Sequence, residues 1–72
     1  MQVGTRVRQL RTQQKLSMET LARRADTSIA TISRLERSNA YPKVETLIRI
    51  ATELDTSVSF LLEDKAQPEE QS

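Results

Sequence analysis

The stretch LSMETLARRADTSIATISRLERSNAYP, residues 16–42, decides the fold that we expect for this chain. It contains two segments with helical periodicity, 18–25 and 29–37, which only three residues separate. Ser17 and Ser28 stand directly before these segments, and a serine there accepts a hydrogen bond from the free N–H groups of the first helical turn. Two short helices joined by so tight a break predict a helix-turn-helix unit, whose second helix crosses the first steeply and projects from the domain.

Helical periodicity continues on both sides of this unit. The stripe formed by Val3, Val7 and Leu10 predicts a first helix of about three turns, a fourth helix is expected over residues 44–54, and Ser57 is placed to begin a short fifth. The residues expected to face inward from the middle helices are Leu21, Ala22, Ala25, Ile32, Leu35, Leu47, Ile50, Ala51 and Leu54. The sequence therefore predicts an all-α, compact five-helix domain over residues 1–63, and a disordered polar tail or linker over residues 64–72.

The composition narrows the classes of function. Cysteine and histidine are both absent from the 72 residues, which removes thiolate metal sites, disulfides, the commonest metal ligand and the commonest general base. Adjacent acids occur at 63–64 and 69–70, but they come with no pocket to shift their pKa values and no nucleophile. We therefore expect no enzyme, no metal and no cofactor or small-molecule ligand. Since no apolar run is long enough to cross a bilayer, we expect a soluble cytoplasmic protein without a membrane partner.

The net charge of +1 conceals an asymmetry along the chain. Residues 1–49 contain ten Lys/Arg and four Asp/Glu, a balance of +6, whereas residues 50–72 contain one lysine and six acids, a balance of −5. A basic N-terminal part and an acidic C-terminal part indicate a polyanionic partner that binds one side of the domain. The alternative, which charge alone leaves open, is chance clustering on a solvated surface.

The rotation of the third helix indicates which residues it presents to a partner. With Ile32 and Leu35 inward, Ala30, Ser33, Arg34 and Arg37 point outward, and Ile29 and Thr31 lie on the flanks. A stripe of small residues with arginine suits the DNA major groove, where Arg34 can bind guanine and a small side chain can touch a thymine methyl. The predicted base-reading residues are Ile29, Ala30, Thr31, Ser33 and Arg34. The alternatives are that the two arginines are merely solvated and that Ile29 packs on the domain.

Short motifs spread over residues 3–63 carry a family resemblance. They are VGTRVRQLR (3–11), LS (16–17), LA (21–22), ISRLER (32–37), Pro42, TL (46–47) and LL (61–62). In this order and spacing they resemble the Xre-type, lambda-repressor-like helix-turn-helix domains. The resemblance implies a domain that binds double-stranded DNA, and it implies that Arg11 pairs with Glu36 and is held beside the DNA backbone. Glu36 also needs such a partner because it lies near the inward face of its helix.

Three departures from the family pattern affect the expected site. Met18 stands where the family often has a glutamine that holds a phosphate, so only the backbone amide remains there. Asp26 and Ser38 replace glycines, and Asp26 must take the left-handed conformation at some cost in stability. The predicted phosphate-binding residues are Arg11, Met18, Ser28, Arg37, Asn39, Tyr41 and Lys43.

These features predict a sequence-specific transcriptional regulator, and more specifically a repressor, that binds a two-fold symmetric operator as a homodimer. The alternative is an antitoxin or protein-interaction module that uses the same fold mainly to dock a partner protein. The last helix is too short to bury four apolar residues on one face, so we expect at least one of them to be exposed. The predicted dimer interface comprises Val58, Phe60, Leu61 and Leu62, with help from the loop around Tyr41.

Overall fold

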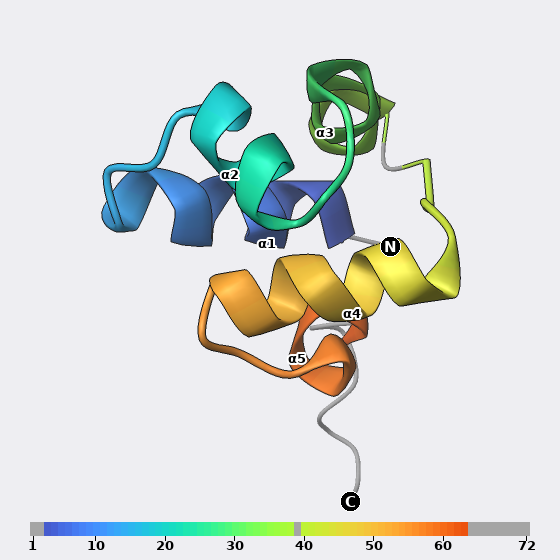
Figure 1. The fold of residues 1–72 in the computed structure, drawn as a ribbon. Coiled ribbons are helices and arrows are strands. Elements are labelled where there is room, and N and C mark those ends of the chain that lie inside the picture. The colour runs from blue at the N-terminus through green and yellow to red at the C-terminus, as the bar shows by residue number, and fades with distance from the viewer. Residues whose placement is uncertain (1–2, 39, 64–72) are drawn as a thin grey trace, which may run out of the picture.

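The computed structural model describes residues 3–38 and 40–63, so the predicted tail over residues 64–72 and the predicted contact of Asn39 lie outside the described residues. Its helices are α1 (Val3–Gln13), α2 (Met18–Arg24), α3 (Ile29–Ser38), α4 (Val44–Glu53) and α5 (Val58–Leu62). In the view of Figure 1, α2 and α3 lie above α1, and α4 and α5 lie below it. The expected all-α, five-helix fold is confirmed, and no described helix is long and apolar enough to span a membrane.

Three serines begin helices as the sequence predicts. Ser17 accepts a hydrogen bond from the Thr20 N–H at 3.0 Å, and Ser57 accepts one from the Phe60 N–H at the same distance. Ser28 accepts from the Thr31 N–H at 3.1 Å. Each hydroxyl satisfies a backbone donor that has no partner within its helix, which fixes where α2, α3 and α5 begin.

Three helices end on a residue in the left-handed conformation, although none of these residues is glycine. The φ angles are 58° at Lys15, 57° at Asp26 and 60° at Asp55. In each case the next N–H reaches back to a carbonyl in the last turn at 2.9 Å, as in the bond from Thr27 to the Ala22 carbonyl. Asp26 was expected to adopt this conformation, whereas Lys15 and Asp55 were not. A side chain with a Cβ costs about 1–2 kcal/mol in this region, so each ending trims the stability of the domain.

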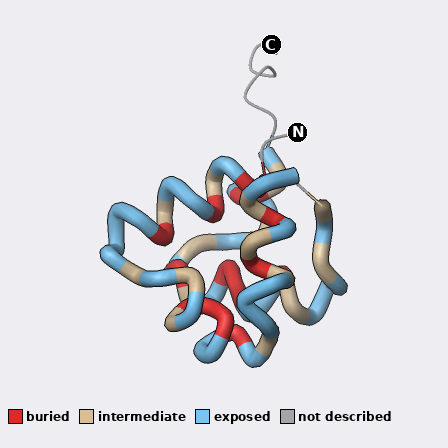
Figure 2. The backbone as a smooth tube through the Cα atoms, turned by 90° about the horizontal axis from the view of Figure 1, so that it is seen from above, coloured by how far each residue is buried: buried red, intermediate tan, exposed pale blue. Residues whose placement is uncertain are grey.

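The core lies where α1, α2, α3 and α4 meet, and α5 closes it from the side of α1 and α4. All nine residues expected to face inward from the middle helices are buried. Figure 2 shows buried positions recurring along the helices between exposed ones, as amphipathic packing requires. One expectation is wrong: Leu61, assigned to the dimer interface, is fully buried because α5 packs it into the core. Phe60 is the exposed apolar residue of α5, 40% accessible.

Candidate nucleic-acid interface

The outer face of α3 projects from the domain. Its inner face is fixed by Ile32 and Leu35, both completely buried against α1 and α2. On the outside Ala30, Arg34 and Arg37 are exposed, while Thr31 and Ser33 on the flanks are half-buried. Ala30, Arg34 and Arg37 lie as the predicted rotation places them, whereas Ser33 was expected to point outward and is half-buried. This arrangement leaves a ridge of small side chains and arginine available to a partner.

A hollow of about 170 Å³ runs along one flank of α3. Its walls come from α1, α2 and α3 and are formed by Arg8, Arg11, Met18, Ser33, Glu36 and Arg37. Arg8 and Arg37 are exposed. The Glu36 carboxylate is engaged by Arg11, so it offsets that guanidinium and leaves the other two cations facing the hollow. The ionised side chains that line the hollow have a formal balance of +2, from three arginines and one glutamate.

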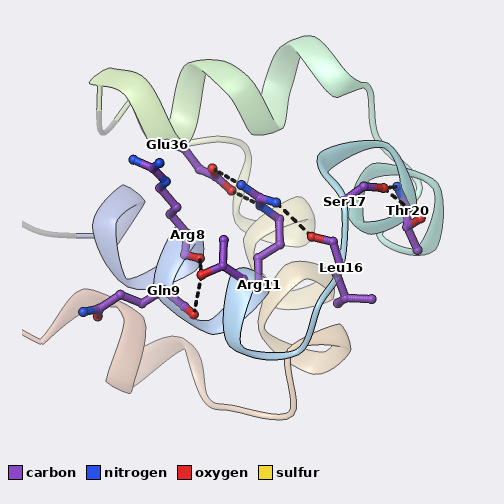
Figure 3. Close-up of polar contacts among 8 residues, drawn as sticks. Arg8, Gln9, Arg11, Leu16, Ser17, Thr20 and Glu36 are labelled. Atoms are coloured by element: carbon purple, nitrogen blue, oxygen red, sulfur yellow. Dashed lines mark hydrogen bonds and ion pairs between the residues drawn. The ribbon is translucent and has the colours of Figure 1, made fainter.

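Arg8 is the member of this hollow that the sequence analysis missed. It lies one turn of helix before Thr12, whose hydroxyl donates to the Arg8 carbonyl at 2.9 Å. The side chain of Arg8 extends from α1 toward Glu36 on α3, as Figure 3 shows. The sequence offered no signal that distinguishes Arg8 from an ordinary solvated arginine. Arg8 lines the same hollow as Arg37 because α1 packs against α3.

A second hollow, of about 400 Å³, lies along the opposite flank of α3. It is lined by Asp26, Thr27, Thr31, Arg34, Pro42, Lys43 and Thr46, which are mostly polar and include two cations. Arg34 and Lys43 therefore approach the same space from α3 and from the start of α4. The exposed ridge of α3 thus stands between two hollows, and the ion pairs among the described residues involve none of Arg8, Arg37, Arg34 and Lys43. The second hollow also contains the Asp26 carboxylate, which lies 3.6 Å from Arg49.

The ion pair predicted between Arg11 and Glu36 is present. Arg11 donates from Nε to Glu36 Oε2 at 2.7 Å and from Nη2 to Oε1 at 3.0 Å, a two-pronged geometry that Figure 3 shows. The remaining guanidinium nitrogen donates to the Leu16 carbonyl at 2.8 Å. The hydrogen bonds to Glu36 raise the pKa of Arg11 above its ordinary value, despite the opposing effect of burial. Arg11 is therefore permanently charged and rigidly held, and it joins α1, the turn before α2, and α3.

The remaining predicted site residues differ in how far they can reach a partner. Ser28 and Lys43 are exposed, as are Ile29 and Tyr41, with 48% and 54% of their surfaces accessible. The side chain of Met18 packs partly on the core and lines the smaller hollow, and its backbone amide, the predicted phosphate donor, stands at the start of α2. Within the described part of the chain, no three acidic side chains gather to hold a metal ion.

Comparison with known proteins places this geometry in a family. The family model described as helix-turn-helix matches residues 7–61. The N-terminal DNA-binding domain of SinR from Bacillus subtilis is 30% identical, with a TM-score of 0.83 over 92% of this chain and 97% of that domain. SinR, the master regulator for biofilm formation, in complex with DNA gives 31% identity and a TM-score of 0.79 over 85% of this chain and 98% of that one.

SinR in its complex with SinI gives 28% identity and a TM-score of 0.82, over 96% of this chain and 68% of that one. Among proteins of curated function, none matches the sequence. Because the family model spans most of the domain and includes α2, the turn at Asp26 and α3, this chain belongs to the Xre-type, lambda-repressor-like helix-turn-helix family.

Proposed function

We propose that the chain is a transcriptional regulator, and specifically a repressor, that binds double-stranded DNA sequence-specifically as a homodimer. The observation that carries this proposal is the exposed ridge of α3 between two cation-lined hollows. The major groove of DNA admits one α-helix, and a phosphate backbone runs along each side of it. The likeness to SinR, which has been determined in complex with DNA, supports the proposal.

Base reading is assigned to the ridge. Arg34 is exposed and its planar guanidinium can donate two hydrogen bonds to the O6 and N7 of one guanine. Ala30 is small enough to let the helix approach, and the Thr31 and Ile29 methyl groups can contact thymine methyls. Ser33 lies at the edge of the smaller hollow, between the bases and the backbone.

Backbone binding is assigned to the two hollows. Arg8 and Arg37 take a phosphate on one side of α3, with Arg11 held behind them by Glu36. Lys43 takes a phosphate on the other side, where Tyr41 and the exposed hydroxyl of Ser28 are further contacts. Contacts of this kind fix the position of the helix without reading sequence, so they support binding to any duplex.

A salt titration of binding to random duplex DNA tests the proposal. Each phosphate contact contributes about one unit to the slope of log K against log salt, so four or more contacts give a steep decline. A variant lacking Arg8 and Arg37 should show a slope shallower by roughly two. Arg23→Ala, which removes an exposed arginine that lines neither hollow, is the matched control and should leave the slope unchanged. Absence of binding at low salt would favour the alternative, a module that docks a partner protein.

A further inference from the structure

A carboxylate stands among the cations of the larger hollow. Asp26 lines this hollow together with Arg34 from α3 and Lys43 from the start of α4. Its side chain is 86% exposed and pairs with Arg49 at 3.6 Å. Among the described residues, no ion pair joins Asp26 to either of the two cations that share its hollow. Its negative charge therefore borders the space in which the proposed function places a DNA phosphate.

The turn between α2 and α3 does not require this charge. Asp26 adopts the left-handed conformation, with a φ angle of 57°, and the N–H of Thr27 donates to the Ala22 carbonyl at 2.9 Å. Glycine adopts this conformation without a Cβ clash, and asparagine tolerates it as aspartate does. The backbone thus accounts for a small or short polar residue at this position, but not for a carboxylate.

The pair with Arg49 does not account for the charge either. Its 3.6 Å separation is longer than the roughly 2.7–2.9 Å of a charge-assisted hydrogen bond. The side chains of Arg49 and Asp26 are 50% and 86% exposed, and exposed pairs contribute little to stability. The pair of Arg11 with Glu36 differs on both counts, at 2.7 Å and with exposures of 11% and 3%. The main effect of the Asp26 charge is therefore expected in the hollow.

We propose that Asp26 is a selectivity-determining residue that keeps Arg34 from binding the DNA backbone. This inference rests on the proposed function, in which Arg34 reads guanine and Lys43 binds a phosphate. On a duplex that lacks the right guanine, Arg34 can turn to the backbone and bind the phosphate that Lys43 holds, because both cations line one hollow. Such a contact carries no sequence information and stabilises binding to any duplex. The Asp26 carboxylate opposes it by repelling a phosphate that lies between the two cations.

The dimensions of the hollow set the size of this repulsion. A sphere of 400 Å³ is about 9 Å across, so a phosphate in the hollow lies within one Debye length of the carboxylate, about 10 Å in 0.1 M salt. Because Asp26 is well exposed to water, the effect on the binding constant is modest, roughly three- to ten-fold. On the preferred site Arg34 is engaged by guanine, and the phosphate binds to Lys43 alone, farther from Asp26. The carboxylate therefore weakens binding to random DNA more than binding to the preferred site.

Asp26→Asn tests the proposal, because asparagine removes the charge and keeps both the size of the side chain and the left-handed turn. Binding is measured on a random-sequence duplex and on the site that the wild-type chain selects from a random pool. In 0.1 M salt the variant should bind the random duplex roughly three- to ten-fold more tightly, and the selected site about two-fold more tightly or less. Its melting temperature should stay close to that of the wild type, since the pair with Arg49 is weak. In an Arg34→Ala background the gain on the random duplex should fall to about two-fold or less, because the opposed contact needs Arg34.

Asp55→Asn is the matched control. Asp55 is exposed and has a φ angle of 60°, but it lies between α4 and α5 and lines neither hollow. The same change in net charge should therefore leave the ratio of the two affinities unaltered.

Four results would overturn the proposal: no gain on the random duplex for Asp26→Asn, an equal gain on both duplexes, an equal gain in the Arg34→Ala background, or the same loss of selectivity in the control. Each of them leaves DNA binding itself intact. If the wild-type chain and Asp26→Asn both failed to bind any duplex at low salt, the proposed function would be refuted, and this inference with it.

Discussion

Replacing Glu36 by alanine is the substitution whose consequence the structure specifies best. The two side chains of the pair with Arg11 are 11% and 3% exposed, and Glu36 accepts two of the three hydrogen bonds that the Arg11 guanidinium makes. Alanine removes both acceptors and leaves a positive charge in a mostly buried position. Removing one partner of a fully buried pair typically costs about 3–5 kcal/mol.

The cost here should be smaller, because Arg11 keeps its bond to the Leu16 carbonyl and some access to water. We expect Glu36→Ala to lower the free energy of unfolding by about 2–3 kcal/mol. A domain of this size rarely has more than about 3–5 kcal/mol in total, so roughly 40% or more of its stability depends on the pair. The corresponding fall in melting temperature is on the order of 10–20 °C.

Thermal and urea unfolding, followed by circular dichroism, measure this loss. The raised pKa of Arg11 means that the arginine loses its proton only above the ordinary arginine range, so the loss should be equal at about pH 6 and pH 9. Arg11→Met/Glu36→Leu, which replaces both partners by apolar groups, should recover much of the stability. Glu19→Ala, at an exposed acid of α2, should cost about 0.5 kcal/mol or less. An unchanged melting temperature for Glu36→Ala would refute the assigned role of the pair.

Three further substitutions have distinct signatures. Arg34→Ala should cost about 1–3 kcal/mol on the selected site and relax preference at one base pair per half-site, whereas equal losses on specific and random duplexes would make Arg34 a phosphate contact. Arg8→Ala should weaken binding equally on both duplexes and lower the salt slope by about one, and an unchanged slope would exclude Arg8 from the backbone contacts. Lys15→Gly should raise the free energy of unfolding by about 0.5–1 kcal/mol, as measured by urea unfolding, because glycine adopts the left-handed conformation without a Cβ clash. A destabilised Lys15→Gly would contradict that cause.

Much of the fold could be predicted because its signals are local. Ser17, Ser28 and Ser57 each stand directly before a helix and accept a hydrogen bond from its first turn, so three helix starts could be predicted. Apolar spacing identified the buried faces for the same reason, since burial follows the helical period. The left-handed ending at Lys15 was missed because lysine has no preference for that conformation. The ending at Asp55 was missed although aspartate tolerates the conformation, as Asp26 does.

The residues of the candidate site were harder to predict, because their positions depend on how the helices cross. The pairing of Arg11 with Glu36 was expected from the family resemblance, and the position of a carboxylate near an inward face indicated that it needs a partner. Arg8 was not, since its place beside Arg37 is set by the packing of α1 against α3. The burial of Leu61 was also missed, because a helix of five residues has too little periodicity to show which apolar side chain faces the core.

Selection of bound sites from a pool of random duplex DNA tests most directly whether α3 reads a base sequence. The wild-type chain should enrich a two-fold symmetric site whose half-site centres lie about 10 base pairs apart, one turn of DNA. Arg34→Ala, run in parallel, should lose preference at one base pair in each half-site and keep the same spacing. A pool that stays random after repeated rounds, although the wild-type chain binds it in low salt, would contradict sequence reading by α3.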